Sequence, residues 1–457
     1  DRPMKGTASL KTEPNWGASF VTWSADRRTA EIHRLSAPAP LPSMANLRLE
    51  LNAGETGFVS QEGKALPGYA LSFTTGTEVV EGPYVVRSVP TSGARDVDPY
   101  LDTVEFHFSE AMMPVGGFTN SGWWPWTLTW SDDGKIAYAR RGTAGSPLYG
   151  HTAMLIPIGM RGADGEEMTA SYTLQFTTSD PPMERVAADP EKGFYWPYYL
   201  FVPSRITTPG TLLIEPNNTG TWGDDPWLHE RSALSLLRWR SSFAVDLGCP
   251  LLVPVFPRPM HPSAPEPGGI YIHALDRYSL TGEWTGIGHI DDQMAAMIGD
   301  ALDRLRAMGH TMDDKVFMMG FSASGAFTSR FAALHPELLK AAAPGSPGGW
   351  PCAPVSSWQG VSLPYPFGIQ DIGEFNLDAF RQVALYIYIG GTDTNDAVDF
   401  RGIHPADQDR IKQLLHYPDD PILANRWPLA ESIYTSVGAD ATFVVYPGVP
   451  QDRKSVV

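Results

Sequence analysis

The sequence predicts a multidomain protein in which an all-β amino-terminal part is followed by an α/β domain with a mostly parallel sheet. Residues 1–180 read as short strand segments separated by Gly, Pro and Asn clusters, without a convincing amphipathic helix. After the linker Thr178–Pro182, helical and strand patterns alternate, which is typical of a sheet covered by helices. A chain of 457 residues is also too long for one ordinary domain. We therefore expect the α/β domain to occupy residues 186–457.

An internal repeat divides the all-β part into two copies. Thr22–Ser24 recurs as Thr129–Ser131, and Tyr69–Thr75 recurs as Tyr172–Thr178. Both offsets are about 100 residues, which suits a seven-strand β-sandwich. The repeat predicts two tandem sandwiches, and the alignment of the copies indicates that the first one lacks its opening strand.

The sandwiches are expected over residues 1–80 and 83–180. Val86–Pro99 followed by Val104–Met112, with a closing Phe-Thr-Thr, resembles the bacterial immunoglobulin-like (Ig-like) domain of surface-layer and secreted proteins. That resemblance implies a spacer or binding arm and an extracellular or periplasmic location. The cluster Trp123–Trp126 could bind a sugar or polymer, although packing between domains is the simpler interpretation.

Composition narrows the classes of partner. The formal net charge of −17 disfavours nucleic acid and anionic membrane surfaces, and favours a neutral or cationic substrate. No stretch approaches the roughly 20 apolar residues of a membrane span, and the chain begins at Asp1 without a signal-peptide pattern. Cys249 and Cys352 read as buried free thiols, with a single bridge as the alternative. We expect neither a metal nor a cofactor.

The stretch from Lys315 to Gly325 is the expected functional centre. An apolar run with the composition of a buried strand ends in a small-residue turn at Ser322, and a helical pattern follows from Ala323. A serine in such a turn projects its hydroxyl away from the backbone, and the N–H of Ala323 then points to where an oxyanion would form. A Gly/Ser-rich turn without chemistry is the alternative.

This turn resembles the nucleophile elbow of the α/β-hydrolases, Gly-x-Ser-x-Gly, with Gly320 and Ser322 in place and the last glycine displaced to Gly325. The family's chain order is serine, acid, histidine. It implies Asp393 as the acid, after a buried strand, with Asp396 as the second candidate. A solvated Asp/Asn turn is the alternative for both carboxylates.

The same resemblance implies a second oxyanion donor, Asn217 or Asn218, in the loop after the strand Thr211–Glu215. Trp350 is a candidate wall of the acyl or alcohol pocket, with packing against the prolines of its loop as an equal alternative. The segments around these positions together look like those of polyhydroxybutyrate-depolymerase-like bacterial hydrolases: Glu215–Gly220, Gly320–Gly325, Gly345–Pro351 and Gly391–Asp396.

The family's catalytic histidine is missing from its place. After the strand Ala441–Tyr446 the family has a Pro-Gly-x-Gly-His turn, whereas here Pro447–Val449 continues into a segment without histidine. Asp452–Val457 reads as a translated sequencing adapter, so we expect a metagenomic open reading frame that was cut short. His404 and His416 are the histidines that follow Asp393; those before it, such as His229, His273, His289 and His335, are expected to be structural.

These patterns favour a secreted serine hydrolase of carboxylic esters, small or polymeric, acting through an acyl-enzyme on Ser322 and weakened by loss of the histidine. A related serine peptidase or amidase is one alternative. A hydrolase-like protein that binds a polymer without cleaving it is the other. The acyl chain length and the oligomeric state are left open.

Overall fold

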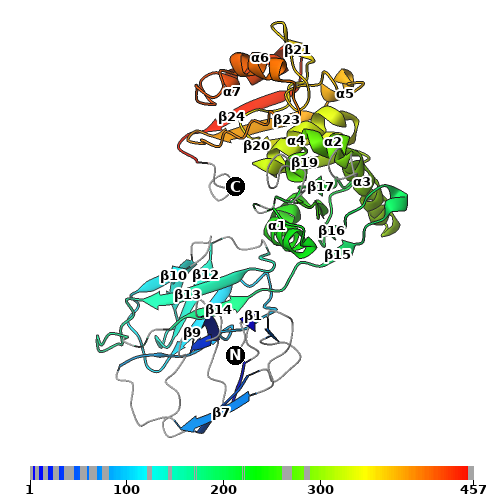
Figure 1. Cartoon of the computed structure of the whole chain (residues 1–457). Helices are drawn as coiled ribbons and strands as arrows, with labels where there is room; N and C mark the ends of the chain where they lie inside the picture. The colour runs from blue at the N-terminus through cyan, green and yellow to red at the C-terminus, as the bar shows by residue number, and fades with distance from the viewer. Residues whose placement is uncertain are drawn as a thin grey trace. The chain divides into compact units, whose positions relative to one another are not determined.

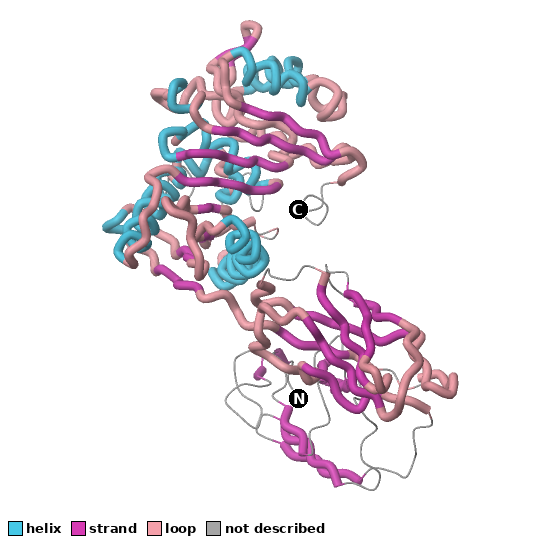
Figure 2. The backbone as a smooth tube through the Cα atoms, turned by 180° about the vertical axis from the view of Figure 1, so that it is seen from behind, coloured by secondary structure: helices cyan, strands magenta, loops and turns pink. Residues whose placement is uncertain are grey.

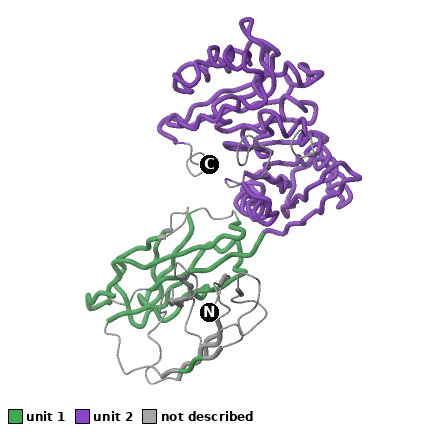
Figure 3. The backbone as a smooth tube through the Cα atoms, in the orientation of Figure 1, with its two compact units in different colours: residues 1–180 green, residues 181–457 purple. Residues whose placement is uncertain are grey.

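The computed structural model divides into two compact units, Asp1–Asp180 and Pro181–Val457 (Figures 1 and 3). The structure describes residues 82–450, apart from 121–125, 143–146, 169, 171, 219, 221, 260–269 and 283–288, and before Gly82 it describes only the strands between Met4 and Thr74.

The first unit is built from antiparallel strands. Its earlier strands are β1 (Met4–Lys5), β2 (Leu10–Glu13), β3 (Ser19–Trp23), β4 (Ala30–Arg34), β5 (Asn46–Leu51), β6 (Val59–Ser60) and β7 (Tyr69–Thr74). They pair as β1-β6, β2-β5-β7 and β3-β4. The predicted copies over residues 1–80 and 83–180, and their Ig-like identity, stay predictions. Trp123 and Trp124 lie outside the described residues.

The later part of this unit has two sheets around one core. The sheet β11-β12-β9-β8 and the sheet β10-β13-β14 are formed by β8 (Val85–Val89), β9 (Thr103–Phe108), β10 (Gly117–Asn120), β11 (Trp126–Trp130), β12 (Ile136–Arg141), β13 (Thr152–Ile158) and β14 (Leu174–Thr177). Side chains alternate between buried and less buried along β9 and β12, as expected where one face of a sheet covers a core. Phe106, Leu155 and Leu174 lie in that core.

An eight-stranded sheet forms the centre of the second unit, and Figure 2 shows its strands side by side with helices flanking them. The strand order is β15-β16-β18-β17-β19-β20-β23-β24. The strands are β15 (Met183–Val186), β16 (Tyr198–Phe201), β17 (Leu213–Ile214), β18 (Leu251–Pro254), β19 (Val316–Phe321), β20 (Leu339–Gly345), β23 (Ala384–Gly390) and β24 (Ala441–Tyr446). β16 alone runs opposite to the other seven strands. The expected mostly parallel sheet is thus confirmed, and it is consistent with an α/β-hydrolase domain.

Seven described helices accompany the sheet: α1 (Pro226–Leu247), α2 (Arg277–Thr281), α3 (Ile290–Ala307), α4 (Ala323–Leu334), α5 (Leu377–Phe380), α6 (Pro405–Leu415) and α7 (Arg426–Ser436). The short strands β21 (Ser357–Trp358) and β22 (Val361–Ser362) form a separate hairpin. None of the helices in the described residues is both long and apolar enough to cross a bilayer.

Local sequence explains where the main helices begin and end. The Asp225 side chain accepts the N–H of Trp227 at 3.0 Å and caps α1, which ends at left-handed Gly248. The apolar stripe of α3 is buried from Ile290 to Leu305, whereas Met308, which continues the same helical spacing, lies beyond the helix and is exposed. Because α3 ends one residue earlier, the stripe does not reach Met308.

The last strand of the sheet, β24, pairs only with β23 among the described strands. No residue of β24 is fully buried, and Val445 is 39% exposed. The two cysteines are buried free thiols, and burial raises the pKa of Cys352 to about 12.

Candidate active site

Ser322 occupies a strained position between β19 and α4. Its backbone angles are φ 61° and ψ −120°, and a positive φ of this kind is rare for residues other than glycine. Its N–H donates to the Gly345 carbonyl at 2.9 Å, and its own carbonyl accepts the N–H of Ala326 at 2.9 Å. The turn is therefore fixed on both sides of the serine, by β20 and by the first turn of α4.

Two glycines make this turn possible. A Cβ on Gly320 would overlap the Ser324 carbonyl, and a Cβ on Gly325 would overlap the carbonyl oxygen of Gly345 on β20. At Gly325, α4 therefore lies too close to β20 for any side chain to fit. Ser324 is fully buried, and its hydroxyl bonds the N–H and carbonyl of Phe321 at 2.9 and 3.0 Å.

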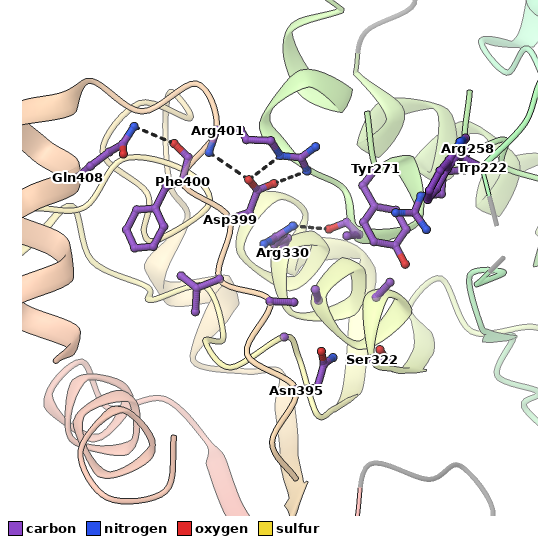
Figure 4. A pocket seen from close by; sticks show the side chains of 16 residues that line it. Trp222, Arg258, Tyr271, Ser322, Arg330, Asn395, Asp399, Phe400, Arg401 and Gln408 are labelled. Carbon is purple, nitrogen blue, oxygen red and sulfur yellow. Dashed lines mark hydrogen bonds and ion pairs between the residues drawn. The ribbon is translucent and has the colours of Figure 1, made fainter. Parts of the chain in front are cut away.

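Ser322 and Ala323 line a cavity of about 920 Å³ (Figure 4). Ala323 is the first residue of α4, so its N–H is one of the donors that have no partner inside the helix. The other walls include Trp222, Arg258, Tyr271, Arg330, Asp399 and Arg401. A serine hydroxyl, a helix N-terminus and a concave site large enough for a small ligand thus meet at one place.

The loop after β17 lies against the turn at Ser322, but its two asparagines have different positions. Asn218 Nδ2 donates to the carbonyl of Phe321, the residue before Ser322, at 3.2 Å. The Asn217 side chain is fully buried and faces away, since its Oδ1 accepts the N–H of Phe256 at 3.0 Å and its Nδ2 donates to the Phe256 carbonyl at 2.9 Å. Asn217 therefore clamps the loop to the end of β18, and Asn218 is the asparagine that touches the turn.

Substitution of Asn217→Ala is expected to lower the free energy of unfolding by about 2–3 kcal/mol, because it leaves the buried N–H of Phe256 without a partner and weakens the bonding of its carbonyl. Asn218→Ala removes a bond in a partly buried place and should cost less than about 1 kcal/mol. Urea denaturation of the full chain measures both values. Equal losses of unfolding free energy in the two variants would contradict the role of Asn217 in holding the loop to β18.

The two candidate acids have different environments. Asp393 follows β23, is 8% exposed, and accepts the N–H of Asn395 at 2.8 Å. Asp396 makes a two-pronged ion pair with buried Arg426, at 2.7 and 2.6 Å. A carboxylate neutralised in this way is a poor partner for a histidine, so the geometry favours Asp393 over Asp396.

Neither substitute histidine reaches the serine. His404 caps α6 through its Nδ1, which accepts the N–H of Ala406 at 3.3 Å, and His416 ends the same helix 3.3 Å from Asp420. Both are exposed, and no histidine is among the described residues that line the Ser322 cavity.

The turn after β24 lies beside the loop that follows β23 and contains Asp393. The N–H of Gly391 donates to the Tyr446 carbonyl at 2.8 Å, and the N–H of Thr392 donates to the Val449 carbonyl at 3.0 Å. Asp393 follows Thr392 directly in this loop. A side chain attached just after Val449 would therefore start close to Asp393.

The earlier histidines have structural contacts. His273 is fully buried, with its Nε2 2.6 Å from the Phe256 carbonyl and 3.3 Å from Asn217 Nδ2. Its ring lies 5.8 Å from that of His229, whose Nε2 is 2.8 Å from the Gly223 carbonyl. Both rings thus support the wall that carries the Asn217 clamp.

His335 pairs with Asp291 at the start of α3, at 3.0 Å. Asp291, His289 and Asp292 are the described residues whose ligand atoms cluster closely enough for a metal, but none of them lines the Ser322 cavity. Because Asp291 already bonds His335, we assign no metal role to this cluster.

Protonation of His335 is expected to stabilise the fold. Burial alone lowers the pKa of His335, but the hydrogen bond to Asp291 and nearby carboxylates outweigh it, and the pKa is raised. The stabilisation is thus fully present below the unfolded pKa of about 6.5 and is lost as pH rises through the folded value. His335→Gln should therefore destabilise the chain more at about pH 6 than at about pH 8.5 in urea denaturation. A pH-independent loss, or the same pH dependence in an Asp291→Asn background, would contradict this.

Trp350 is not a wall of the cavity. It is buried in a separate apolar cluster with Phe367 and Ile411, and its indole N–H donates to the Phe367 carbonyl at 2.9 Å. The structure therefore supports the packing alternative for Trp350.

Sequence reasoning missed the charged wall of the cavity. Arg401 bonds Asp399 at 2.8 and 2.7 Å and lies 3.4 Å from fully buried Asp276. Burial raises the pKa of Asp276, whereas the hydrogen bond and charge of Arg401 outweigh burial and lower the pKa of Asp399. Asp276 also accepts the N–H of Tyr271 at 2.7 Å, which fixes that wall. A sequence signal existed only for Arg258, a charged residue just beyond the carboxyl end of a buried strand.

No protein-family model and no curated protein matches the chain. Among solved structures, poly(aspartic acid) hydrolase-1 from Sphingomonas sp. KT-1 is 14% identical, with a TM-score of 0.40 over 60% of this chain and 95% of its own. A thermostable esterase is 15% identical, with a TM-score of 0.36 over 81% and 91%. An S-formylglutathione hydrolase from Agrobacterium tumefaciens is 13% identical, with a TM-score of 0.34 over 59% and 87%. Similarity at this level assigns no activity to the chain.

Proposed function

We propose that the second unit is a serine hydrolase of carboxylic esters, small or polymeric, with Ser322 as nucleophile and Asp393 as the acid of its catalytic group. The observation that carries the proposal is the conformation of Ser322, whose positive-φ backbone is fixed between β19 and α4 at the edge of a cavity. Strain of this kind persists only where the surrounding structure enforces it, and it exposes the hydroxyl to a ligand.

The reaction would proceed in two steps. Ser322 Oγ attacks the ester carbonyl, its proton passes to a base, and the new oxyanion is stabilised by the N–H of Ala323 and by the loop that contains Asn218. The ester C–O bond then breaks, the alcohol leaves with a proton, and water cleaves the acyl-enzyme. Since the described residues bring no histidine to Ser322, the proton transfers are slow and we expect weak turnover.

Active-site labelling tests this proposal without requiring fast turnover. A fluorophosphonate should modify Ser322 in the full chain, as shown by peptide mass spectrometry, and Ser322→Ala should abolish both the label and hydrolysis of p-nitrophenyl esters. Ser346→Ala is the control, because this serine also has a positive φ but does not line the cavity. Labelling elsewhere, with Ser322 unmodified, would overturn the proposal.

Assays on the same protein distinguish two other functions from ester hydrolysis. Faster turnover of aminoacyl nitroanilides than of p-nitrophenyl esters would indicate a peptidase or amidase. Retention on an insoluble polyester by both the wild type and Ser322→Ala, without any label on Ser322, would indicate a binding protein. We further propose, from its sequence motifs alone, that the first unit is an Ig-like arm of an exported protein; an export assay of the complete gene product tests this.

A further inference from the structure

The cavity beside Ser322 has a positive lining in an acidic protein. Its described walls contain Arg258, Arg330 and Arg401 but only one carboxylate, Asp399, whereas the chain as a whole has a formal net charge of −17. Charges in a concave, partly desolvated site interact more strongly with a ligand than distant surface charges do, because salt and water screen the latter. The lining therefore decides which ligands the cavity accepts.

Two of the three arginines are held by the protein itself. Arg401 bonds both oxygens of Asp399 and also lies 3.4 Å from Asp276. Arg330 is buried at 7% exposure and donates to the Ala274 carbonyl at 2.7 Å. Their charges are balanced locally by Asp399 and Asp276, so they mainly fix the shape of this wall.

Arg258 is different, because no carboxylate among the described residues pairs with it. Its Nη1 donates to the Gly220 carbonyl at 3.2 Å, and its Nε is buried without a hydrogen-bond partner. Its guanidinium lies 3.7 Å from the ring centre of Tyr271 and 5.8 Å from that of Trp222 (Figure 4). A guanidinium has five N–H donors in a planar fork, so most of its capacity remains available.

The two aromatic rings orient this fork. Stacking on Tyr271 fixes the plane of the guanidinium, and the Tyr271 backbone is itself fixed by Asp276. An arginine that is already oriented loses little conformational freedom when it binds a ligand. The planar partner that matches such a fork is a carboxylate, which can accept two parallel hydrogen bonds.

We propose that Arg258 binds a carboxylate on the substrate, so that the esters processed at Ser322 are anionic, such as half-esters of dicarboxylic acids or acidic polyesters. This inference rests on the proposed ester hydrolysis and adds its substrate class. It also revises the expectation from net charge, which favoured neutral or cationic substrates. The local charge of the cavity outweighs the distant surface charge because the surface is screened.

Binding to the Ser322→Ala chain tests the inference without any chemistry. Two ligands of equal chain length are compared by calorimetry: mono-p-nitrophenyl glutarate, which carries a carboxylate, and p-nitrophenyl pentanoate, which carries a methyl group at that end. The anionic ester should bind about tenfold or more tightly, as expected for a charge-assisted pair. Equal or tighter binding of the pentanoate would overturn the inference.

Variants of Arg258 test whether this residue causes the preference for the anionic ester. In the Ser322→Ala background, Arg258→Gln should remove the preference for the anionic ester, and Arg258→Lys should retain part of it. Arg231→Gln is the matched control, because this exposed arginine of α1 changes the net charge equally without lining the cavity. A preference that survives Arg258→Gln, or is lost in Arg231→Gln, would assign the anion site elsewhere.

The two proposals fail in different ways. If Ser322 is not labelled but the glutarate ester still binds through Arg258, ester hydrolysis is wrong and the cavity is an anion-binding site. If Ser322 is labelled and the pentanoate binds equally well, hydrolysis stands and the anionic substrate class is wrong. The ligand comparison itself needs no Arg258 variant, so it remains decisive even if Arg258→Gln fails to fold.

Discussion

Replacing Pro450→Gly together with Gln451→His is expected to raise ester hydrolysis by about 10²–10⁴-fold, the usual contribution of a general base. The change recreates the Pro-Gly-x-Gly-His turn of the resembled family directly after Val449. The Val449 carbonyl accepts the N–H of Thr392, the residue before Asp393, so the altered segment begins beside the candidate acid. Initial rates with p-nitrophenyl esters measure the gain.

Three comparisons assign this gain to a base acting on the serine. Pro450→Gly combined with Gln451→Asn should give no gain, because an amide cannot accept the proton. Adding Ser322→Ala or Asp393→Asn to the double variant should remove most of the gain. If the unmodified chain is already fast and His404→Ala or His416→Ala abolishes its activity, the base is one of those histidines and the interpretation of the turn is wrong.

Gly325→Ala is expected to destabilise the second unit by several kcal/mol, on the order of 3–5, and to eliminate labelling of Ser322. The added Cβ would overlap the carbonyl oxygen of Gly345, which is backbone of a central strand and cannot move aside as a flexible side chain could. The same carbonyl accepts the Ser322 N–H, so any shift that relieves the overlap also disturbs the nucleophile turn.

Gly299→Ala is the matched control for this substitution. Gly299 lies within α3, and a Cβ there would meet no atom within 4 Å. Because alanine is the better helix former, this variant should gain about 0.5–1 kcal/mol. Urea denaturation of the full-length variants gives both values. A loss at Gly325 no larger than about 1 kcal/mol would mean that α4 can move away from β20 without breaking the turn.

The framework of the second unit could be predicted because its signals are local and periodic. Buried strands such as β19 are continuous apolar runs, Asp225 and Gly248 mark the two ends of α1, and α3 carries an apolar stripe with helical spacing. The position of Ser322 between strand and helix follows from the same patterns, and the resemblance then orders the remaining candidates along the chain.

The walls of the site could not be predicted, because they depend on where loop side chains point. Nothing in the sequence distinguishes Asn217, whose side chain binds Phe256, from Asn218, whose side chain binds the nucleophile turn. From its position in the chain, Trp350 could equally line the pocket or pack in its loop, and a partner in another loop, Phe367, holds it in a core. The stacking of Arg258 on Tyr271 joins two loops that have no periodic pattern.

The open edge of β24 has a consequence for how the protein behaves in concentrated solution. Its outer N–H and carbonyl groups face no described strand, and Val445 and Tyr386 add exposed apolar surface nearby. Such an edge is a template on which another molecule can add a strand. The net charge of −17 opposes this by repulsion between molecules, but the repulsion disappears near the isoelectric point of about 5.0. Purification and storage well above that pH, at low ionic strength, should therefore keep the chain from precipitating as edge-paired aggregates.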